Sequence, residues 1–285
     1  MIIIILIIFI INIKMFMKLR DWIDINKINW DYLSYNKNAI KLLKENPDKI
    51  NWNTLSRNLG AIELLRENPN KINWLQLSYN SEAISLLKKN LDKINWRTLS
   101  DNKNAIELLK NNQHNINWSY LSFNPNAIKL LKENAHKIDW YALSLNANAI
   151  ELLKENQDKI DWELLSFNEN AIELLKDNPD KINWDNLSLN INAIELLKNN
   201  PNKINWDELS RNENAIELLK DNQDKIEWDG LSFNSSIFTY DYQKIKQNFE
   251  KLGEELIAKA LHPKRIFRLI EEYGEDEIYN NYFDD

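Results

Sequence analysis

Apolar and polar residues follow a pattern that repeats every 22 residues along most of the chain. Each unit opens with a Trp. Counted from that Trp as position 0, Leu recurs at +3, Ser at +4, Asn at +6, Ala-Ile at +9 and +10, and Leu-Leu at +12 and +13. A strict period of about 20–50 residues is typical of a solenoid or repeat array. Ten tryptophans keep this spacing without insertion or deletion: Trp30, Trp52, Trp74, Trp96, Trp118, Trp140, Trp162, Trp184, Trp206 and Trp228.

The second half of each unit, from +9 to +16, predicts an amphipathic helix, because Ala, Ile and the two Leu fall on one side at the α-helical period. Asn at +8 and Glu at +11, such as Asn104 and Glu107, predict a capping box at its start. Asn at +16 favours a left-handed turn at its end, and Pro47 follows one such Asn directly. Glu at +11 also faces Lys at +14 on the solvent side.

The first half predicts a shorter helix from the Trp to about +5, capped by the Asn or Asp before the Trp, such as Asp139. Trp, Leu at +3 and Ser at +4 share its inner face. A leucine-rich-repeat-like solenoid is the alternative, but its strand needs a Leu-x-Leu alternation, and +4 is always Ser here. The prediction is therefore an all-α protein: an α-solenoid of about ten 22-residue, two-helix repeats with a helical C-terminal cap.

The repeat array is expected to span residues 27–234, after an N-terminal lead-in at 17–26. Residues 235–285 break the pattern and predict the cap, with one long amphipathic helix over 241–261 and a second one after Pro263. A stacked array exposes a repeat face at each end, which terminal caps normally cover. At a helix-packing distance of 8–10 Å, ten units would form an open rod or arc of about 80–100 Å.

Residues 1–16 form an apolar extension with three interpretations. Eleven apolar residues cover about 17 Å as a helix, which is short for a membrane anchor. The segment also lacks the basic start and the cleavage site that a signal peptide would have. The third interpretation, a start assigned too early, is favoured because Ile, Lys and Asn have AT-rich codons and Val is absent. Met17 would then be the true start, and membrane association would require that residues 1–16 are translated.

The amino-acid composition predicts that the protein is not an enzyme. Four Gly are too few for phosphate-binding loops, and the absence of Cys excludes disulfides, thiolate nucleophiles and Cys-ligated zinc. The histidines His114, His136 and His262 are too few and too scattered for a metal site, and solvated turn positions are the simpler interpretation. The carboxylates lie on outer faces opposite Lys. We expect no catalytic residues, no metal, no cofactor and no small-molecule substrate.

The variable positions +1, +2 and +5 of the first helices are the candidate partner-binding surface. Exposed aromatic residues on a rigid scaffold are typical of protein-binding surfaces. The alternative is that +5 packs onto the adjacent repeat. A single-stranded nucleic-acid-binding repeat protein is a second functional hypothesis, which the net charge of −7 and the pI near 5.3 disfavour. The candidate stripe comprises Tyr32, Tyr35, Tyr79, Tyr120, Phe123, Tyr141, Leu145, Phe167, Leu189 and Phe233.

The run NANAIELLKENQDKIDWELLSFN at 146–168, together with the segment YDYQKIKQNFEKLGEELIAKALHPKRI at 240–266, resembles an uncharacterised 22-residue-repeat family of giant DNA viruses of the mimivirus kind. The resemblance covers roughly residues 17–285. It implies a viral origin, a repeat scaffold in the cytoplasm of an infected cell, and host or viral protein partners, but no activity. Gly60 and Glu82 depart from the family pattern where Asn would cap, and we expect them to loosen the second and third units.

Overall fold

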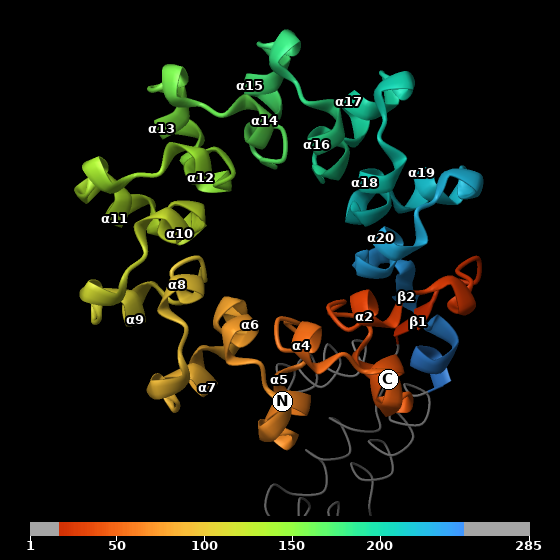
Figure 1. Cartoon of the computed structure of the whole chain (residues 1–285). Coiled ribbons are helices and arrows are strands. Elements are labelled where there is room, and N and C mark those ends of the chain that lie inside the picture. Colours follow the sequence, from red (N-terminus) through yellow and green to blue (C-terminus); the bar gives the residue numbers. More distant parts are fainter. Residues whose placement is uncertain (1–16, 248–285) are drawn as a thin grey trace, which may run out of the picture. The chain divides into compact units, whose positions relative to one another are not determined.

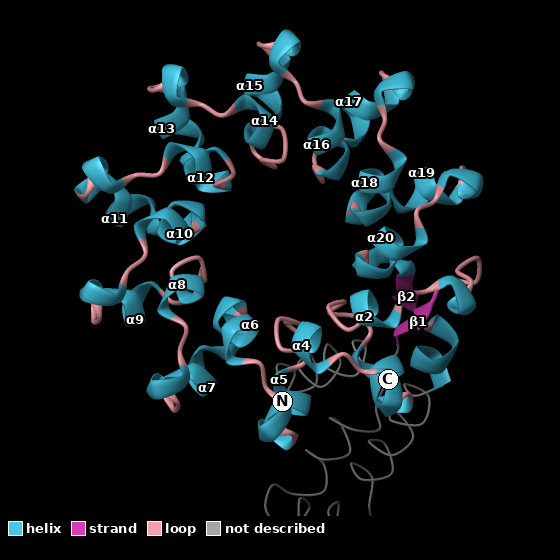
Figure 2. Cartoon of the chain, in the orientation of Figure 1, coloured by secondary structure: helices cyan, strands magenta, loops and turns pink. Residues whose placement is uncertain are grey.

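The computed structural model describes residues 17–247. The larger of its two compact units, Leu19–Phe238, contains all ten repeats. We number the repeats 1–10 from Trp30 to Trp228. The α-helical prediction is confirmed: each Trp begins a short α-helix, and in repeats 1–9 a second α-helix begins ten residues later (Figure 2). Two three-residue strands, β1 (Met17–Leu19) and β2 (Phe238–Tyr240), form the two-stranded sheet.

The first helices of the repeats lie on the inside of the unit and the second helices outside them (Figure 1). The inner helices are α2 (Trp30–Leu33), α4 (Trp52–Leu55), α6 (Trp74–Tyr79), α8 (Trp96–Leu99), α10 (Trp118–Phe123), α12 (Trp140–Ser144), α14 (Trp162–Leu165), α16 (Trp184–Leu189), α18 (Trp206–Arg211) and α20 (Trp228–Phe233). The outer helices are α3 (Ile40–Glu45), α5 (Ile62–Glu67), α7 (Ile84–Lys88), α9 (Ile106–Lys110), α11 (Ile128–Glu133), α13 (Ile150–Lys154), α15 (Ile172–Lys176), α17 (Ile194–Lys198) and α19 (Ile216–Lys220).

Single turns of 3-10 helix complete the units, which the sequence pattern did not predict. One set precedes each inner helix: η1 (Ile25–Lys27), η2 (Pro47–Lys49), η3 (Pro69–Lys71), η5 (Leu91–Lys93), η6 (Gln113–Asn115), η8 (Ala135–Lys137), η10 (Gln157–Lys159), η11 (Pro179–Lys181), η12 (Pro201–Lys203) and η14 (Gln223–Lys225). A second set joins inner to outer helices in some repeats: η4 (Ser81–Ala83), η7 (Pro125–Ala127), η9 (Ala147–Ala149) and η13 (Glu213–Ala215). In repeat 10, η15 (Ser235–Ile237) leads to β2 instead.

The inner helices are capped by the residue before the Trp, as predicted. The Asn51 side chain accepts from the backbone N–H of Thr54, and the Asp139 side chain accepts from that of Ala142. The Ser at +4 links this start to the preceding repeat. The hydroxyl of Ser34 donates to the carbonyl of Trp30 and accepts from the backbone N–H of Asn51. Ser at this position is buried in every repeat. Its hydroxyl links consecutive repeats through these two hydrogen bonds.

The Asn at +6 is the main polar link between repeats. In repeat 5, Asn124 is fully buried, and its amide donates to the carbonyl oxygens of Ser100 and Asn102 in repeat 4 at 3.0 and 2.9 Å. Its side-chain oxygen accepts from the backbone N–H of Asn126. A buried amide with every hydrogen-bonding group satisfied specifies one register between neighbours. All ten +6 Asn residues make this double donation to the preceding repeat: Asn36, Asn58, Asn80, Asn102, Asn124, Asn146, Asn168, Asn190, Asn212 and Asn234.

The capping box predicted at +8 and +11 is wrong. The outer helix α9 has Ala105 at its N-cap, without a side-chain hydrogen bond. Asn104 instead donates across to the carbonyl of Ser81 in the preceding repeat, because +6 already supplies the local cap. Glu107 pairs with Lys110 on the outside at 3.2 Å, as its spacing predicted.

The predicted left-handed residue at +16 is also wrong. Asn46 has φ −134° and ψ 64°, and its amide donates to the carbonyl of Leu42 four residues back. The side chain therefore satisfies one of the free carbonyls at the helix end directly, and no positive φ is needed. The chain then enters the 3-10 turn that leads to the next Trp.

The core consists of Leu at +3, Leu at +13 and Ala at +9, all fully buried, as Leu121, Leu131 and Ala127 are in repeat 5. The expectation that the Trp belongs to this core needs correction. The repeat tryptophans are only half-buried. In nine of the ten repeats, the Lys three residues before the next Trp lies over the indole ring at 4.2–5.6 Å from its centroid. Within residues 17–247 Trp96 is the exception, since Asn115 replaces that Lys.

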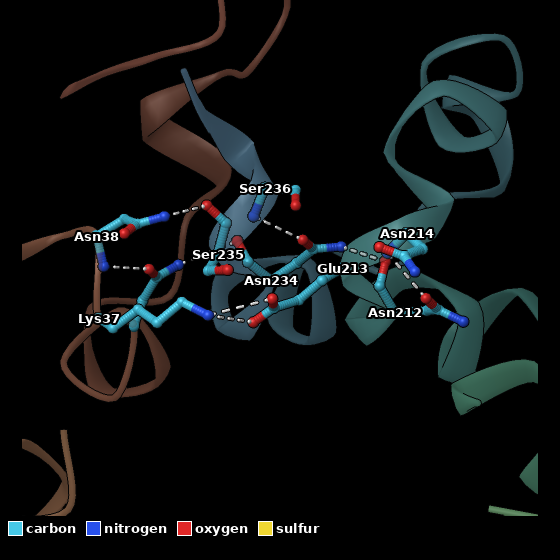
Figure 3. Close-up of polar contacts among 9 residues, drawn as sticks. Lys37, Asn38, Asn212, Glu213, Asn214, Asn234, Ser235 and Ser236 are labelled. Carbon is cyan, nitrogen blue, oxygen red and sulfur yellow. Dashed lines mark hydrogen bonds and ion pairs between the residues drawn. The ribbon is translucent and has the colours of Figure 1, made fainter. Parts of the chain in front are cut away.

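The expected open rod or arc is also wrong, because repeat 1 packs on repeat 10 and closes the unit into a ring (Figure 1). We call this contact the seam. Asn38 donates to the carbonyl of Ser235 at 3.0 Å, and the Lys37 ammonium reaches the carboxylate of Glu213 (Figure 3). Lys27 lies over Trp228 at 4.8 Å, as each later Lys lies over the preceding Trp. Closure of ten repeats requires a rotation of about 36° per repeat.

The structure tests the predicted C-terminal cap only at its start. In repeat 10 the strand β2 stands where the other repeats begin an outer helix, and residues 242–247 are helical. The rest of the cap, including His262 and Pro263, lies outside the described residues, as does the extension 1–16. Repeat 1 covers the face of repeat 10, so a separate cap is not required there.

Candidate partner-binding surface

The candidate stripe belongs to the inner helices and their C-terminal ends, and these helices line the inside of the ring (Figure 1). Its members differ in exposure. Tyr141 is 59% exposed, whereas Tyr32 and Tyr35 are 37% and 39% exposed. The other seven are half-buried: Tyr79, Tyr120, Phe123, Leu145, Phe167, Leu189 and Phe233. The stripe is thus an accessible surface at some positions and part of the packing at others.

Contacts between neighbouring repeats explain the partial burial at +5. The guanidinium of Arg57 lies over the ring of Tyr79 at 4.2 Å and over that of Tyr35 at 5.9 Å. Across the seam, Phe233 stacks on Tyr32 with 4.4 Å between ring centroids and meets Tyr35 edge-on at 5.9 Å. The +5 side chains therefore contact the adjacent repeat, as the alternative interpretation expected, while their role as a partner-binding surface stays a prediction.

The apolar part of the stripe borders a groove of about 300 Å³ that crosses repeats 5–8. Consecutive +5 residues form one side, and the residues two positions later form the other. The +7 positions were missed by the sequence analysis, although they are as variable as +5. The groove is lined by Phe123, Leu145, Phe167 and Leu189 at +5 and by Pro125, Ala147, Glu169 and Ile191 at +7.

A second groove, of about 270 Å³, crosses the seam and has a different chemistry. Tyr35 and Phe233 line it together with Arg57, Thr54 and the amides of Asn53 and Gln76. These residues belong to repeats 10, 1, 2 and 3, and repeat 10 adjoins repeat 1 only because the ring is closed. The ring therefore offers an apolar groove on one side and a polar, aromatic one at the seam.

Two titratable groups next to the seam groove have shifted pKa values. Burial raises the pKa of the Tyr79 phenol, and the Tyr120 side chain raises it further. Burial also raises the pKa of the Asp101 carboxyl, against the opposing effect of the Arg57 guanidinium. The two groups also interact, because the negative charge of the Asp101 carboxyl adds to the rise in the pKa of Tyr79.

Other chemistry is sparse in the described part of the chain. His114 and His136 are exposed in equivalent turns, and residues 17–247 contain no group of three or more His, Cys, Asp or Glu side chains arranged to hold a metal ion. None of the helices in this range has the length and apolar character needed to cross a bilayer. Leu75, 45% exposed at +1 of α6, is an accessible apolar residue that the candidate stripe omitted.

No family model, curated protein or solved structure matches the chain. The resemblance to viral repeat proteins therefore stays a prediction, and the surface must be interpreted from its own geometry.

Proposed function

We propose that the protein is a non-enzymatic repeat scaffold that binds a protein partner through the inside of the ring. The observation that supports this most is the apolar groove over repeats 5–8, together with the exposed Tyr141 in α12 of repeat 6. Apolar and aromatic side chains that remain accessible on a rigid scaffold favour protein recognition. A viral origin and a location in the cytoplasm of an infected cell remain part of this proposal.

Ring closure supports the proposal energetically. Every repeat is fastened to both neighbours, so the inner side chains are held before a partner arrives. Preorganisation lowers the entropic cost of association and favours affinity. Binding of single-stranded nucleic acid is the weaker candidate, since exposed carboxylates stand at +1 in half of the inner helices and would repel phosphates.

Site-specific photo-crosslinking tests the proposal in cells that produce the protein. A benzophenone amino acid at Tyr141, on the inside, should crosslink a defined protein. The same probe at Lys129, on the outer helix α11, is the control. We expect a crosslinked partner from position 141 alone, and its loss when Leu145 and Phe167 are changed to Ser. Equal crosslinking from both positions, or none from either, would contradict the proposal.

A further inference from the structure

Five consecutive repeats carry a carboxylate at +1 of the inner helix, and they are consecutive only because the ring is closed. Four belong to repeats 7–10, and the fifth belongs to repeat 1, on the other side of the seam. Asn29 Nδ2 of repeat 1 donates to Asp229 Oδ1 of repeat 10 at 3.1 Å, which joins the two ends of the run. We call this run the acidic sector: Glu163, Asp185, Asp207, Asp229 and Asp31, all exposed.

The acidic sector is not neutralised by the protein itself. Within residues 17–247 none of its five carboxylates forms an ion pair. Asp185 and Asp31 accept only neutral side-chain amides, from Asn205 and Asn51 at 2.9 and 3.0 Å. The outside of the ring differs, because the Glu residues of the outer helices pair with Lys three residues on, as Glu173 does with Lys176 at 2.8 Å.

The cations closest to the acidic sector are already engaged elsewhere. Arg211, the only basic residue of α18, pairs with Glu208 at 3.6 Å and lies over the ring of Phe233. The Lys residues that precede the inner helices lie over Trp rings, as Lys181 does over Trp162 at 4.2 Å. These cations have other contacts, and within residues 17–247 none of them forms an ion pair with a carboxylate of the acidic sector.

The acidic sector and the apolar groove share helices. Asp185 and Leu189 lie four residues apart in α16, and Phe167 follows Glu163 of α14 by four residues, in the turn after that helix. Residues four apart occupy the same face of a helix, one turn from each other. A ligand that contacts Phe167 and Leu189 therefore lies near the carboxylates of the same two repeats. The other carboxylates of the acidic sector follow in the next repeats toward the seam.

We propose that the inside of the ring binds a Lys/Arg-rich amphipathic polypeptide segment. Its apolar side chains occupy the groove of repeats 5–8, and its basic side chains face the acidic sector. This inference rests on the proposed function and specifies the class of partner. Carboxylates that form no ion pair within the ring select for basic segments and against acidic ones, since like charges across an interface carry a large penalty.

The test uses three synthetic peptides of equal length and the full-length protein, with binding measured by fluorescence anisotropy at several salt concentrations. The first peptide has Leu on one face of a helix and Lys on the other. The second peptide has Glu in place of every Lys, and the third has Ser in place of every Leu. We expect the Lys/Leu peptide to bind, the Glu/Leu peptide not to bind, and the Lys/Ser peptide to bind at least about tenfold more weakly.

Two triple variants locate the interaction. Asp185→Asn, Asp207→Asn and Asp229→Asn remove three inner charges and keep the acceptor oxygens. Glu151→Gln, Glu173→Gln and Glu195→Gln remove three charges from the outer helices and serve as the matched control. We expect the first set to weaken Lys/Leu binding by about tenfold at low salt and to reduce its salt dependence, while the control stays within about twofold. Circular dichroism verifies that both variants remain folded.

Equal losses from the two variants would overturn the proposal, since the attraction would then be unspecific. Failure of the Lys/Leu peptide to bind would overturn it as well. If the Glu/Leu peptide bound as tightly as the Lys/Leu peptide, the inference of a basic partner would be excluded, while the proposed function would be unaffected. A missing crosslink at Tyr141 in cells would instead remove the proposed function, so the two failures are distinguishable.

Discussion

Asn36 of the first repeat donates from its side-chain amide to the carbonyl oxygens of Ser232 and Asn234 of the tenth repeat, at 3.3 and 3.0 Å. These two acceptors lie 196 and 198 residues from Asn36 along the chain. The two ends of the array thereby form the same pair of hydrogen bonds that links every other pair of neighbouring repeats. At these residues the seam uses the same hydrogen bonds as the other junctions between repeats, although strand β2 replaces the outer helix in repeat 10.

Replacement of Asn36 by Ala should be as destabilising as replacement of Asn124, although Asn36 belongs to the first repeat. Each change leaves two buried carbonyls of the preceding repeat without their donor, at a cost of about 1–3 kcal/mol. Urea unfolding measures both losses. In an open array Asn36 would have no preceding repeat, so a negligible effect of Asn36→Ala beside a large effect of Asn124→Ala would contradict closure.

Asn115→Lys should stabilise the ring. It places an ammonium where nine other repeats have one over the preceding Trp, here Trp96, and cation–π contacts contribute about 0.5–1 kcal/mol at exposed sites. Thermal unfolding of the single variant and of Asn115→Lys in a Trp96→Leu background separates the contact from the gain in positive charge. A stabilisation that survives the loss of Trp96 would exclude the cation–π explanation.

Glu82→Asn should also stabilise the ring, because Asn at this position elsewhere donates to the preceding repeat, as Asn104 does to Ser81 at 3.0 Å. One added hydrogen bond contributes about 0.5–1.5 kcal/mol. Gly60→Asn is the informative counterpart. A Cβ at Gly60 would lie 2.7 Å from the carbonyl oxygen of Lys37, so the backbone must shift and we expect no gain. Unfolding midpoints compare the two, and a larger gain at residue 60 would contradict this geometry.

Asp101→Asn should stabilise the protein at neutral pH. Burial raises the pKa of Asp101 in the folded state above its unfolded value of about 3.9, so ionisation favours unfolding. This penalty is fully present above the folded pKa and disappears as the pH falls below about 3.9. Urea unfolding at pH 7 and near pH 3.5 should therefore show a difference that vanishes in acid. Asp180→Asn, at an exposed turn, is the control. Loss of stability at pH 7 would mean that attraction to Arg57 outweighs burial.

Much of the fold could be predicted from the sequence, because each repeat is a local unit. The 22-residue period, the two helices and the cap before Trp140 all follow from spacing and side-chain type. Sequence reasoning misassigned Asn104, since an amide can cap its own helix or bridge to a neighbour with equal chemical plausibility. Nothing in the spacing distinguishes these two uses; the deciding fact is that Asn102 already provides the cap.

Ring closure could not be predicted, because it depends on a small rotation per repeat that arises from packing rather than from residue type. The candidate surface was predictable only in part. Tyr141 is exposed as expected, whereas Phe233 divides its surface between Tyr32 and the groove. The run of carboxylates from Glu163 to Asp31 becomes continuous only when the two ends meet.

Closure is tested most directly by distances between two spin labels, measured by pulsed electron–electron double resonance. The chain has no Cys, so two engineered Cys residues are the only sites that a thiol-reactive label can modify. Labels at the equivalent turn residues Asp48 and Asp92 span two repeats. Labels at Asp48 and Asp224 span eight repeats along the chain but two across the seam. A closed ring gives similar distances for both pairs, and a longer distance from Asp48 to Asp158 on the opposite side. A distance from Asp48 to Asp224 that exceeds the one to Asp158 would contradict the ring.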